Sequence, residues 1–144
     1  MKRFILSLSS LLLCMGVACA SPDRPIGKEQ LPAAAQQFLQ EFFSDVDVTV
    51  AFEDGSAIRR EYDVTLANGT HIEFSADGRC IEVESRGALP RGIVPPSIQT
   101  YVSKYYPSHE ITRLERSRRE WEVRLSNGVD ITFDRGFRVI EIDD

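Results

Sequence analysis

The sequence predicts an α+β fold, in which two tandem helix-plus-strand repeats pack their helices on one face of an antiparallel sheet with about four strands per repeat. Three observations support this prediction. Apolar and polar residues alternate along several short segments, which is typical of strands with one buried face. Two segments that follow prolines have helical apolar spacing. Both patterns occur twice in the chain.

The internal repeat is the strongest signal. Residues 62–69 match residues 121–128, and the match continues downstream at a constant spacing of 59 positions. Upstream, residues 31–43 match residues 94–106 at a spacing of 63 positions. The first copy therefore holds four additional residues, which we expect at a turn formed by residues 53–56.

Helices are predicted to begin just after Pro32 and Pro95, where the missing proline N–H costs nothing. Alternation predicts strands at 46–52, 58–66, 71–75, 79–85, 111–114, 120–125, 129–133 and 137–142. The apolar residues of these strands should face the helices: Tyr62, Val64, Leu66, Ile72, Phe74, Ile81, Val83, Trp121, Val123, Leu125, Ile131, Phe133, Ile140 and Ile142.

Turn residues separate these strands. Asn68-Gly69 and Asn127-Gly128 predict two-residue hairpins. Asp77-Gly78 marks a further turn in the first copy. In the second copy the corresponding turn is Asp134-Arg135-Gly136, shifted by one residue relative to its counterpart, so we expect a different turn type there.

The N-terminus has the organisation of a signal peptide over 1–20. Lys2 and Arg3 precede an apolar run at 4–13, and the small residues before Ser21 predict cleavage after Ala20. The chain is therefore expected to be periplasmic or secreted. The alternative is a lipoprotein anchored through Cys19.

The mature chain is divided into a flexible segment at 21–30, repeat 1 at 31–86 and repeat 2 at 87–144, with both repeats in one folding unit because each is too short for a core of its own. Its net charge is −5 with the leader and more negative without it, which argues against nucleic acid as a partner. No later apolar stretch reaches membrane-spanning length. Cys80 is the single cysteine after the leader and is expected to pack rather than react.

The Tyr62–Gly69 and Trp121–Gly128 motifs, with an aromatic pair at the end of each helical segment, make residues 31–144 resemble the β-lactamase-inhibitor-like, PepSY-like family of periplasmic proteins. The resemblance implies tandem α+β repeats. It also implies a non-enzymatic binding or inhibitory role, with no catalytic or cofactor-binding residues to transfer.

The candidate working surface is the polar face of the predicted sheet. We expect it to bind a protein or peptide of the periplasm or cell envelope, although the same polar residues could serve only solubility. The outward-facing residues predicted from alternation are Asp63, Thr65, His71, Glu73, Glu122, Arg124, Asp130 and Thr132.

The alternative function is a calcium- or small-ligand-regulated periplasmic sensor, because carboxylates are the hard oxygen ligands that calcium prefers. The candidate carboxylates are Asp45, Asp47, Glu53, Asp54, Glu82, Glu84, Glu141, Asp143 and Asp144. Arg113, Arg116, Arg118 and Arg119 form a basic run that we interpret as a surface salt-bridge ladder with Glu115 and Glu120.

Overall fold

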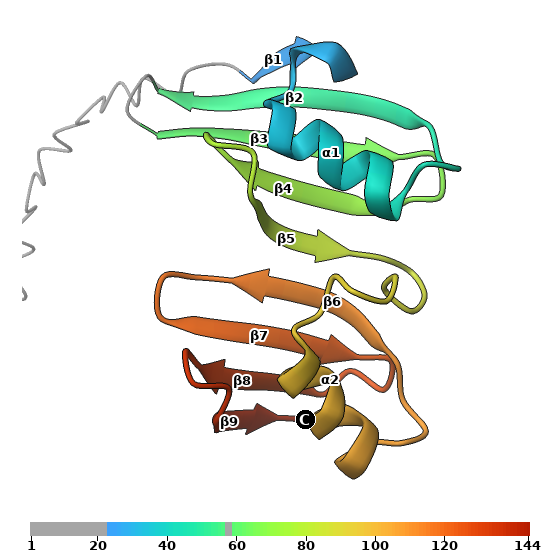
Figure 1. The fold of residues 1–144 in the computed structure, drawn as a ribbon, viewed down its shortest axis with the longest axis vertical. Helices are drawn as coiled ribbons and strands as arrows, with labels where there is room; N and C mark the ends of the chain where they lie inside the picture. Colours follow the sequence, from blue (N-terminus) through green and yellow to red (C-terminus); the bar gives the residue numbers. More distant parts are fainter. Residues whose placement is uncertain (1–22, 57–58) are drawn as a thin grey trace, which may run out of the picture.

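The computed structural model describes residues 23–56 and 59–144, so the predicted signal peptide and both candidate processing sites lie outside the described residues. The described residues form one nine-stranded sheet in which every strand is antiparallel to its neighbours (Figure 1). The strands lie side by side in chain order, from β1 to β9. None of the helices described is long and apolar enough to cross a membrane.

The strands are β1 (Arg24–Ile26), β2 (Val48–Ser56), β3 (Arg59–Leu66), β4 (His71–Ser75), β5 (Cys80–Glu84), β6 (Ile111–Arg116), β7 (Glu120–Leu125), β8 (Asp130–Asp134) and β9 (Val139–Asp143). The helices are α1 (Ala33–Phe42) and α2 (Pro96–Tyr105), and a short 3-10 helix, η1 (Lys28–Gln30), precedes α1. Pro32 and Pro95 occupy the N-cap positions of the two α-helices.

The predicted fold class, α+β with two tandem helix-plus-strand repeats, is wrong. The structure is mostly a single antiparallel sheet that carries only two short helices. Each helix is ten residues long and buries only two of its side chains, so the helices cover parts of the sheet without forming a second layer of comparable extent. The strands hydrogen-bond continuously across the position where the sequence placed a boundary between two units.

That boundary is crossed by β5 and β6. Their antiparallel pairing joins three residue pairs: Glu82 with Glu115, Val83 with Leu114, and Glu84 with Arg113. The ladder ends at Glu82 and Glu115, so the earlier part of β5 and the later part of β6 are not paired with each other. The sheet is therefore continuous but opens at one end of this junction.

Both helices cover the same face of the sheet (Figure 1). Phe38 of α1 meets Phe74 of β4 edge to face, with ring centroids 5.5 Å apart. Tyr101 of α2 meets Phe133 of β8 in the same way at 5.4 Å. Such contacts stabilise the fold beyond what burial of the rings alone provides. The buried residues of both helices form one hydrophobic cluster with the inward-facing residues of the strands. The other face of the sheet carries no helix among the described residues.

Two β-bulges change which apolar residues are buried. Phe74 pairs with Cys80 and Phe133 with Val139, so Ile81 and Ile140 are the additional residues of the bulges. Ile140 is 53% exposed, and Ile142 near the end of the edge strand β9 is 47% exposed. The prediction that Ile140 faces a helix is therefore wrong. Ile142 lies opposite the buried Ile131, on the helix-covered side of the sheet, but remains half-exposed near the end of the edge strand.

The segment 21–30, predicted to be flexible, pairs with the sheet over β1. Arg24, Pro25 and Ile26 lie opposite Glu53, Phe52 and Ala51 of β2. An ion pair of 2.8 Å between Arg24 and Glu53 stabilises this short edge strand, and Ile26 packs against the core.

The hairpins differ from prediction in length and position. Residues 53–56 continue β2 instead of turning, so the first copy's additional residues lengthen the β2–β3 hairpin. The predicted two-residue turn at Asn68-Gly69 holds three residues, because the N–H of Leu66 donates to the carbonyl of Thr70. Gly69 supplies the positive φ that such a turn requires.

The turn at 135–137 has the same form as the turn at 76–78, and the predicted difference in turn type is wrong. In both, the two residues that flank the turn are joined by a backbone hydrogen bond, Ser75 to Arg79 and Asp134 to Arg138. The positive φ falls on Gly78 in the first turn and on Phe137 in the second. Phe137 has a φ of 62°, which side chains with a β-carbon rarely adopt.

We expect this backbone conformation to cost stability. The variant Phe137→Gly should be more stable than Phe137→Ala by about 1 kcal/mol, because both lose the ring and only glycine adopts positive φ without steric cost. Denaturant unfolding of the two variants measures the difference. Equal stability of the two variants would show that the turn is not strained.

Candidate functional site

The eight residues predicted to face outward lie on the helix-free face of the sheet, which we call the open face. They alternate along their strands with buried residues, and each is partly exposed. In register, Asp63 faces Glu73, Thr65 faces His71, Glu122 faces Thr132, and Arg124 faces Asp130. Strands β5 and β6 separate the group on β3 and β4 from the group on β7 and β8, so the structure forms two clusters and not one.

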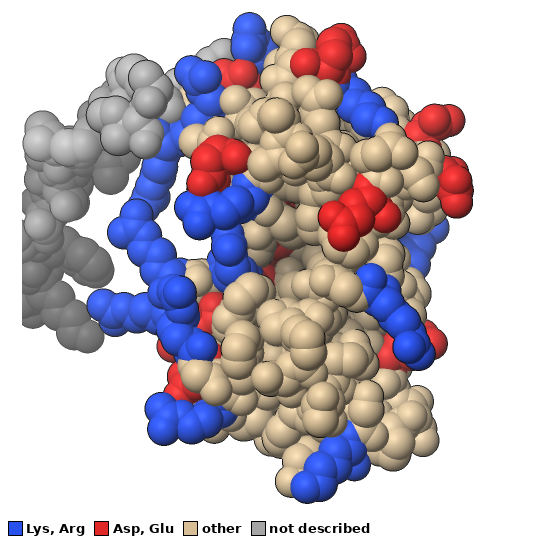
Figure 2. Space-filling view, viewed as in Figure 1, with Lys and Arg blue, Asp and Glu red and all other residues tan. Residues whose placement is uncertain are grey.

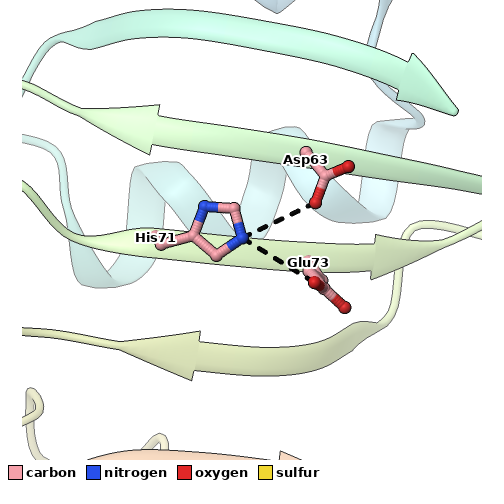
Figure 3. Close-up of side chains that lie close together, drawn as sticks. All are labelled: Asp63, His71 and Glu73. Carbon is pink, nitrogen blue, oxygen red and sulfur yellow. Dashed lines mark ion pairs between the residues drawn. The ribbon is translucent and has the colours of Figure 1, made fainter. Parts of the chain in front are cut away.

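The first cluster brings Asp63, His71 and Glu73 together (Figure 3). His71 Nε2 lies 3.6 Å from Asp63 Oδ1 and 3.7 Å from Glu73 Oε1. One donor atom from each residue lies within 4.8 Å of the other two. The geometry follows from the sheet: His71 and Glu73 lie two positions apart on one strand, and Asp63 lies on the neighbouring strand opposite Glu73.

The carboxyl groups of this cluster are poorly compensated. Partial burial raises the pKa of Asp63, and nearby Asp54, Asp23 and Glu61 raise it further while His71 opposes them. Partial burial also raises the pKa of Glu73, with Glu82, Asp63 and Glu61 adding to the effect and His71 again opposing it. Ionised Asp63 and Glu73 therefore destabilise the fold, and groups kept at such a cost are often functional.

The stability of the protein should depend on pH through Glu73. Because its pKa is raised on folding, the folded protein holds the proton to higher pH, and stability falls as pH rises from the ordinary value of 4.5 through the folded pKa. Glu73→Gln should therefore be more stable than the parent at neutral pH. We expect a few tenths of a kcal/mol, because solvent screens a side chain that is 36% exposed.

This advantage of Glu73→Gln should shrink as the pH is lowered below 4.5, where glutamic acid and glutamine are both neutral. Glu122→Gln is the matched control, because Glu122 accepts a hydrogen bond of 2.8 Å from Arg113 and its loss should destabilise the protein. Thermal melts at several pH values measure both. A Glu73→Gln variant that is less stable than the parent at neutral pH would contradict the prediction.

Two of the three charged residues of the second cluster, Arg124 and Asp130, neutralise each other. Arg124 donates two hydrogen bonds of 2.8 Å to the carboxylate of Asp130, and this bond raises the pKa of Arg124. Glu122 and Thr132 lie beside a hollow of about 160 Å³ on the open face. Four glutamates line it, Glu115, Glu120, Glu122 and Glu141. The other lining residues are Ser117, Thr132 and Ile140.

Arg113 lies on β6, between the two clusters, and joins carboxylates of three neighbouring strands. The sequence did not reveal this role. Its guanidinium, 16% exposed, donates to Glu82 at 2.8 Å and to Glu122 at 2.8 Å, and also pairs with Glu115. These hydrogen bonds raise the pKa of Arg113. Of the predicted ladder, the structure forms the pairing of Arg113 with Glu115. Among the described residues, Arg116, Arg118 and Arg119 form no ion pair with Glu115 or Glu120, so this part of the prediction is wrong. The pairing with Glu82 could be foreseen only by knowing that β5 and β6 are neighbours in the sheet.

The carboxylates proposed from sequence as calcium ligands are not gathered into one site in the part of the chain that the structure describes. There, the group of three potential ligand donors is Asp63, His71 and Glu73. Cys80 is half-buried, and burial raises the pKa of its thiol to about 12, so it is protonated at neutral pH and a poor nucleophile.

Three solved structures are similar to this chain over most of its length. A putative periplasmic protein of the DUF2874 family from Bacteroides vulgatus is 39% identical, with a TM-score of 0.84, covering 87% of this chain and 99% of that one. A putative calcium-regulated periplasmic protein from Bacteroides thetaiotaomicron is 36% identical, with a TM-score of 0.82 and coverages of 85% and 97%. A putative periplasmic protein of unknown function from Bacteroides vulgatus is 27% identical, with a TM-score of 0.80 and coverages of 85% and 100%.

Among curated proteins, none matches this chain. A family model described as "Putative beta-lactamase-inhibitor-like, PepSY-like" matches residues 60–141, which is more than half of the chain. The resemblance drawn from the hairpin motifs is thereby confirmed. The chain belongs to the PepSY-like, β-lactamase-inhibitor-like family.

Proposed function

We propose that this chain is an exported, non-enzymatic binding protein of the periplasm, which docks a protein or peptide through the open face of its sheet. The surface consists of Asp63, Thr65, His71, Glu73, Glu122, Arg124, Asp130 and Thr132. The similar solved structures, which are described as periplasmic proteins, support the location. The inhibitor-like description of the family supports a role in binding.

The observation that carries the proposal is the poorly compensated negative charge of Asp63 and Glu73, which share His71 as a partner. Burial and neighbouring carboxylates raise the pKa of both groups, whereas a surface that served only solubility would leave its charges solvated. The open face carries further carboxylates at Glu82, Glu84, Glu115 and Glu141, and Arg113 and Arg124 lie among them. A partner with a basic surface would supply the missing positive charge.

Affinity capture from a periplasmic extract tests this proposal. The double charge reversal Glu73→Lys with Arg124→Glu should abolish capture of the partner while leaving the net charge unchanged. The matched control is Glu41→Lys with Lys104→Glu, which reverses one exposed charge on each helix, on the other side of the sheet. Capture that survives the first variant, or that is lost equally in both, would place the binding surface elsewhere.

Inhibition of an enzyme is one form that such binding can take, and the family description names it. Direct assays of a β-lactamase and of periplasmic peptidases with the purified chain test this form. Inhibition that disappears in the Glu73→Lys, Arg124→Glu variant would support it, and unchanged enzyme rates at saturating protein would exclude it for those enzymes.

We propose regulation by a divalent cation as a second candidate function, supported by the convergence of Asp63, His71 and Glu73. Calcium prefers oxygen ligands, whereas zinc accepts an imidazole nitrogen together with carboxylates. One structural neighbour is described as calcium-regulated. A cation at this position would also offset the burial and the neighbouring negative charges that together raise the pKa of both carboxyls.

Calorimetric titration with calcium and, separately, with zinc tests the second candidate. We expect heat of binding in the parent and its loss in Asp63→Asn with Glu73→Gln. His71→Ala separates the two metals, because it should weaken zinc more than calcium. Titrations without heat, together with an unchanged melting temperature at millimolar concentrations of either metal, would exclude this function.

We also propose that export ends with cleavage after Ala20, with a lipidated Cys19 as the alternative. Mass spectrometry of the mature protein decides between them. A free amine on Ser21 supports cleavage and excludes the lipid anchor, whereas a diacylglyceryl cysteine at residue 19 has the opposite meaning.

A further inference from the structure

A second binding feature lies on the helix-covered face, opposite the open face. It is a hollow of about 180 Å³ where β5 and β6 diverge, because their pairing ends at Glu82 and Glu115. Helix α1, the segment before α2, and β7 complete its walls. It is lined by Phe38, Cys80, Ile81, Ile93, Leu114, Arg116 and Trp121.

The walls are mostly apolar and are not closed over by the protein's own side chains. Phe38, Ile93 and Trp121 are each partly exposed where they line the hollow. An apolar cavity of roughly 150 Å³ is large enough to admit a benzene-sized ring. The hollow can therefore take one large apolar side chain, and its exposed aromatic walls would gain from burial.

One arginine side chain lines this hollow, and two more arginines follow it closely in the chain. Arg116 lines it, with its guanidinium 5.9 Å from the centre of the Trp121 ring. Arg118 and Arg119 follow in the exposed turn between β6 and β7. Figure 2, which views the helix-covered face, shows basic side chains gathered beside the groove between the two halves of the molecule.

These three arginines, which we call the arginine rim, differ from the arginines of the neighbouring turns. Arg79 pairs with Asp77 at 2.7 Å, and Arg138 pairs with Asp134 at 2.7 Å. Within residues 23–56 and 59–144, no carboxylate lies within ion-pair distance of Arg116, Arg118 or Arg119. The rim therefore offers positive charge to a ligand although the chain as a whole is acidic.

We propose that this hollow binds a peptide segment that inserts one large apolar side chain and places flanking acidic residues on the arginine rim. Apolar walls select the inserted side chain, and guanidinium groups form strong hydrogen bonds to carboxylates. The preference is opposite to that of the open face, which is acidic. The two surfaces lie on opposite faces of the sheet, so this proposal does not rest on the proposed function.

The single tryptophan of the chain provides a specific readout, because Trp121 forms part of the wall. The probe is the capped peptide Glu-Glu-Phe-Glu-Glu, titrated into the mature protein while the emission of Trp121 is recorded. We expect a saturable change in emission. It should be absent for Glu-Glu-Ala-Glu-Glu, which lacks the ring, and for Lys-Lys-Phe-Lys-Lys, whose charge opposes the rim.

Variants of the rim test the electrostatic part. Arg118→Gln with Arg119→Gln should weaken binding of the acidic peptide by about threefold to tenfold, as expected for the loss of two exposed ion pairs. Arg79→Gln with Arg138→Gln is the matched control, because it removes the same charge from two arginines that already have carboxylate partners. Melting temperatures establish that all variants remain folded.

The proposal is overturned if the acidic peptide produces no saturable change in Trp121 emission at concentrations up to about 1 mM. It is equally overturned if the lysine peptide binds as tightly, or if the rim and control variants weaken binding alike. A loss confined to the rim variant, with dependence on the phenylalanine, supports it.

Discussion

Replacing Phe74 with alanine is expected to lower the free energy of unfolding by about 3–5 kcal/mol, the usual cost of removing a fully buried aromatic ring. Phe74 is fully buried and meets Phe38 of α1 edge to face. The substitution would remove both the ring's own burial and an edge-to-face contact between the sheet and α1. Denaturant unfolding followed by circular dichroism measures the loss.

The same variant tests whether the sheet unfolds as one unit. Phe74 lies on β4, whereas the only tryptophan lies on β7, beyond the β5–β6 junction. If the continuous sheet unfolds cooperatively, Phe74→Ala should shift the Trp121 fluorescence transition by the same amount as the circular dichroism transition. Phe133→Ala, which removes the corresponding ring against α2, is the matched variant in the other half. A Trp121 transition that keeps its original midpoint in Phe74→Ala would show that the two halves unfold separately.

Replacing Gly78 with alanine is expected to cost about 2–4 kcal/mol, through two separate effects. Gly78 has a φ of +80°, which glycine adopts without steric cost and alanine does not. In addition, a β-carbon at this position would lie 2.8 Å from the backbone nitrogen of Ala35 and 2.8 Å from Pro32 Cβ. The turn between β4 and β5 therefore packs directly against the beginning of α1, and α1 must shift to accommodate a methyl group.

Gly128→Ala separates these two effects. Gly128 has a φ of +89°, but a β-carbon there would have no atom within 4 Å. Its substitution should therefore cost only about 1 kcal/mol, the price of the backbone conformation alone. Thermal or denaturant unfolding of both variants provides the comparison. Equal losses at the two positions would mean that the contact between the turn and α1 contributes nothing.

The sequence predicted the strands better than the architecture. Alternation located eight of the strands within a few residues, because a half-buried strand must alternate. Alternation could not reveal β1, because Arg24-Pro25-Ile26 is too short to show a period. This segment becomes a strand only through its pairing with β2, which is distant in the sequence. The predicted fold class was wrong because two helical patterns in a repeating sequence suggested a full layer of helices packed on the sheet. Their short length and the β5–β6 pairing become evident only in three dimensions.

The positions of Ile140 and of Arg113 show the same limit at the level of side chains. Alternation assigns Ile140 to the buried face, but the bulge opposite Phe133 moves the burial to Val139. Arg113 seemed to belong to a local basic run, yet two of its carboxylate partners come from β5 and β7. Predicting the outward residues needs only a period of two, whereas predicting which of them meet needs strand order and register.

The strand order from β1 to β9 has a consequence for how the molecule assembles. Each strand pairs with the one before it in the chain. A chain whose N-terminal part becomes available first can therefore extend the sheet strand by strand, because the partner of each new strand is already in place. Only the connections that contain α1 and α2 are long, and short-range pairing of this kind favours rapid folding. At the edge strand β9 of the described sheet, Glu141 and Asp143 place negative charges that discourage the addition of another molecule's strand.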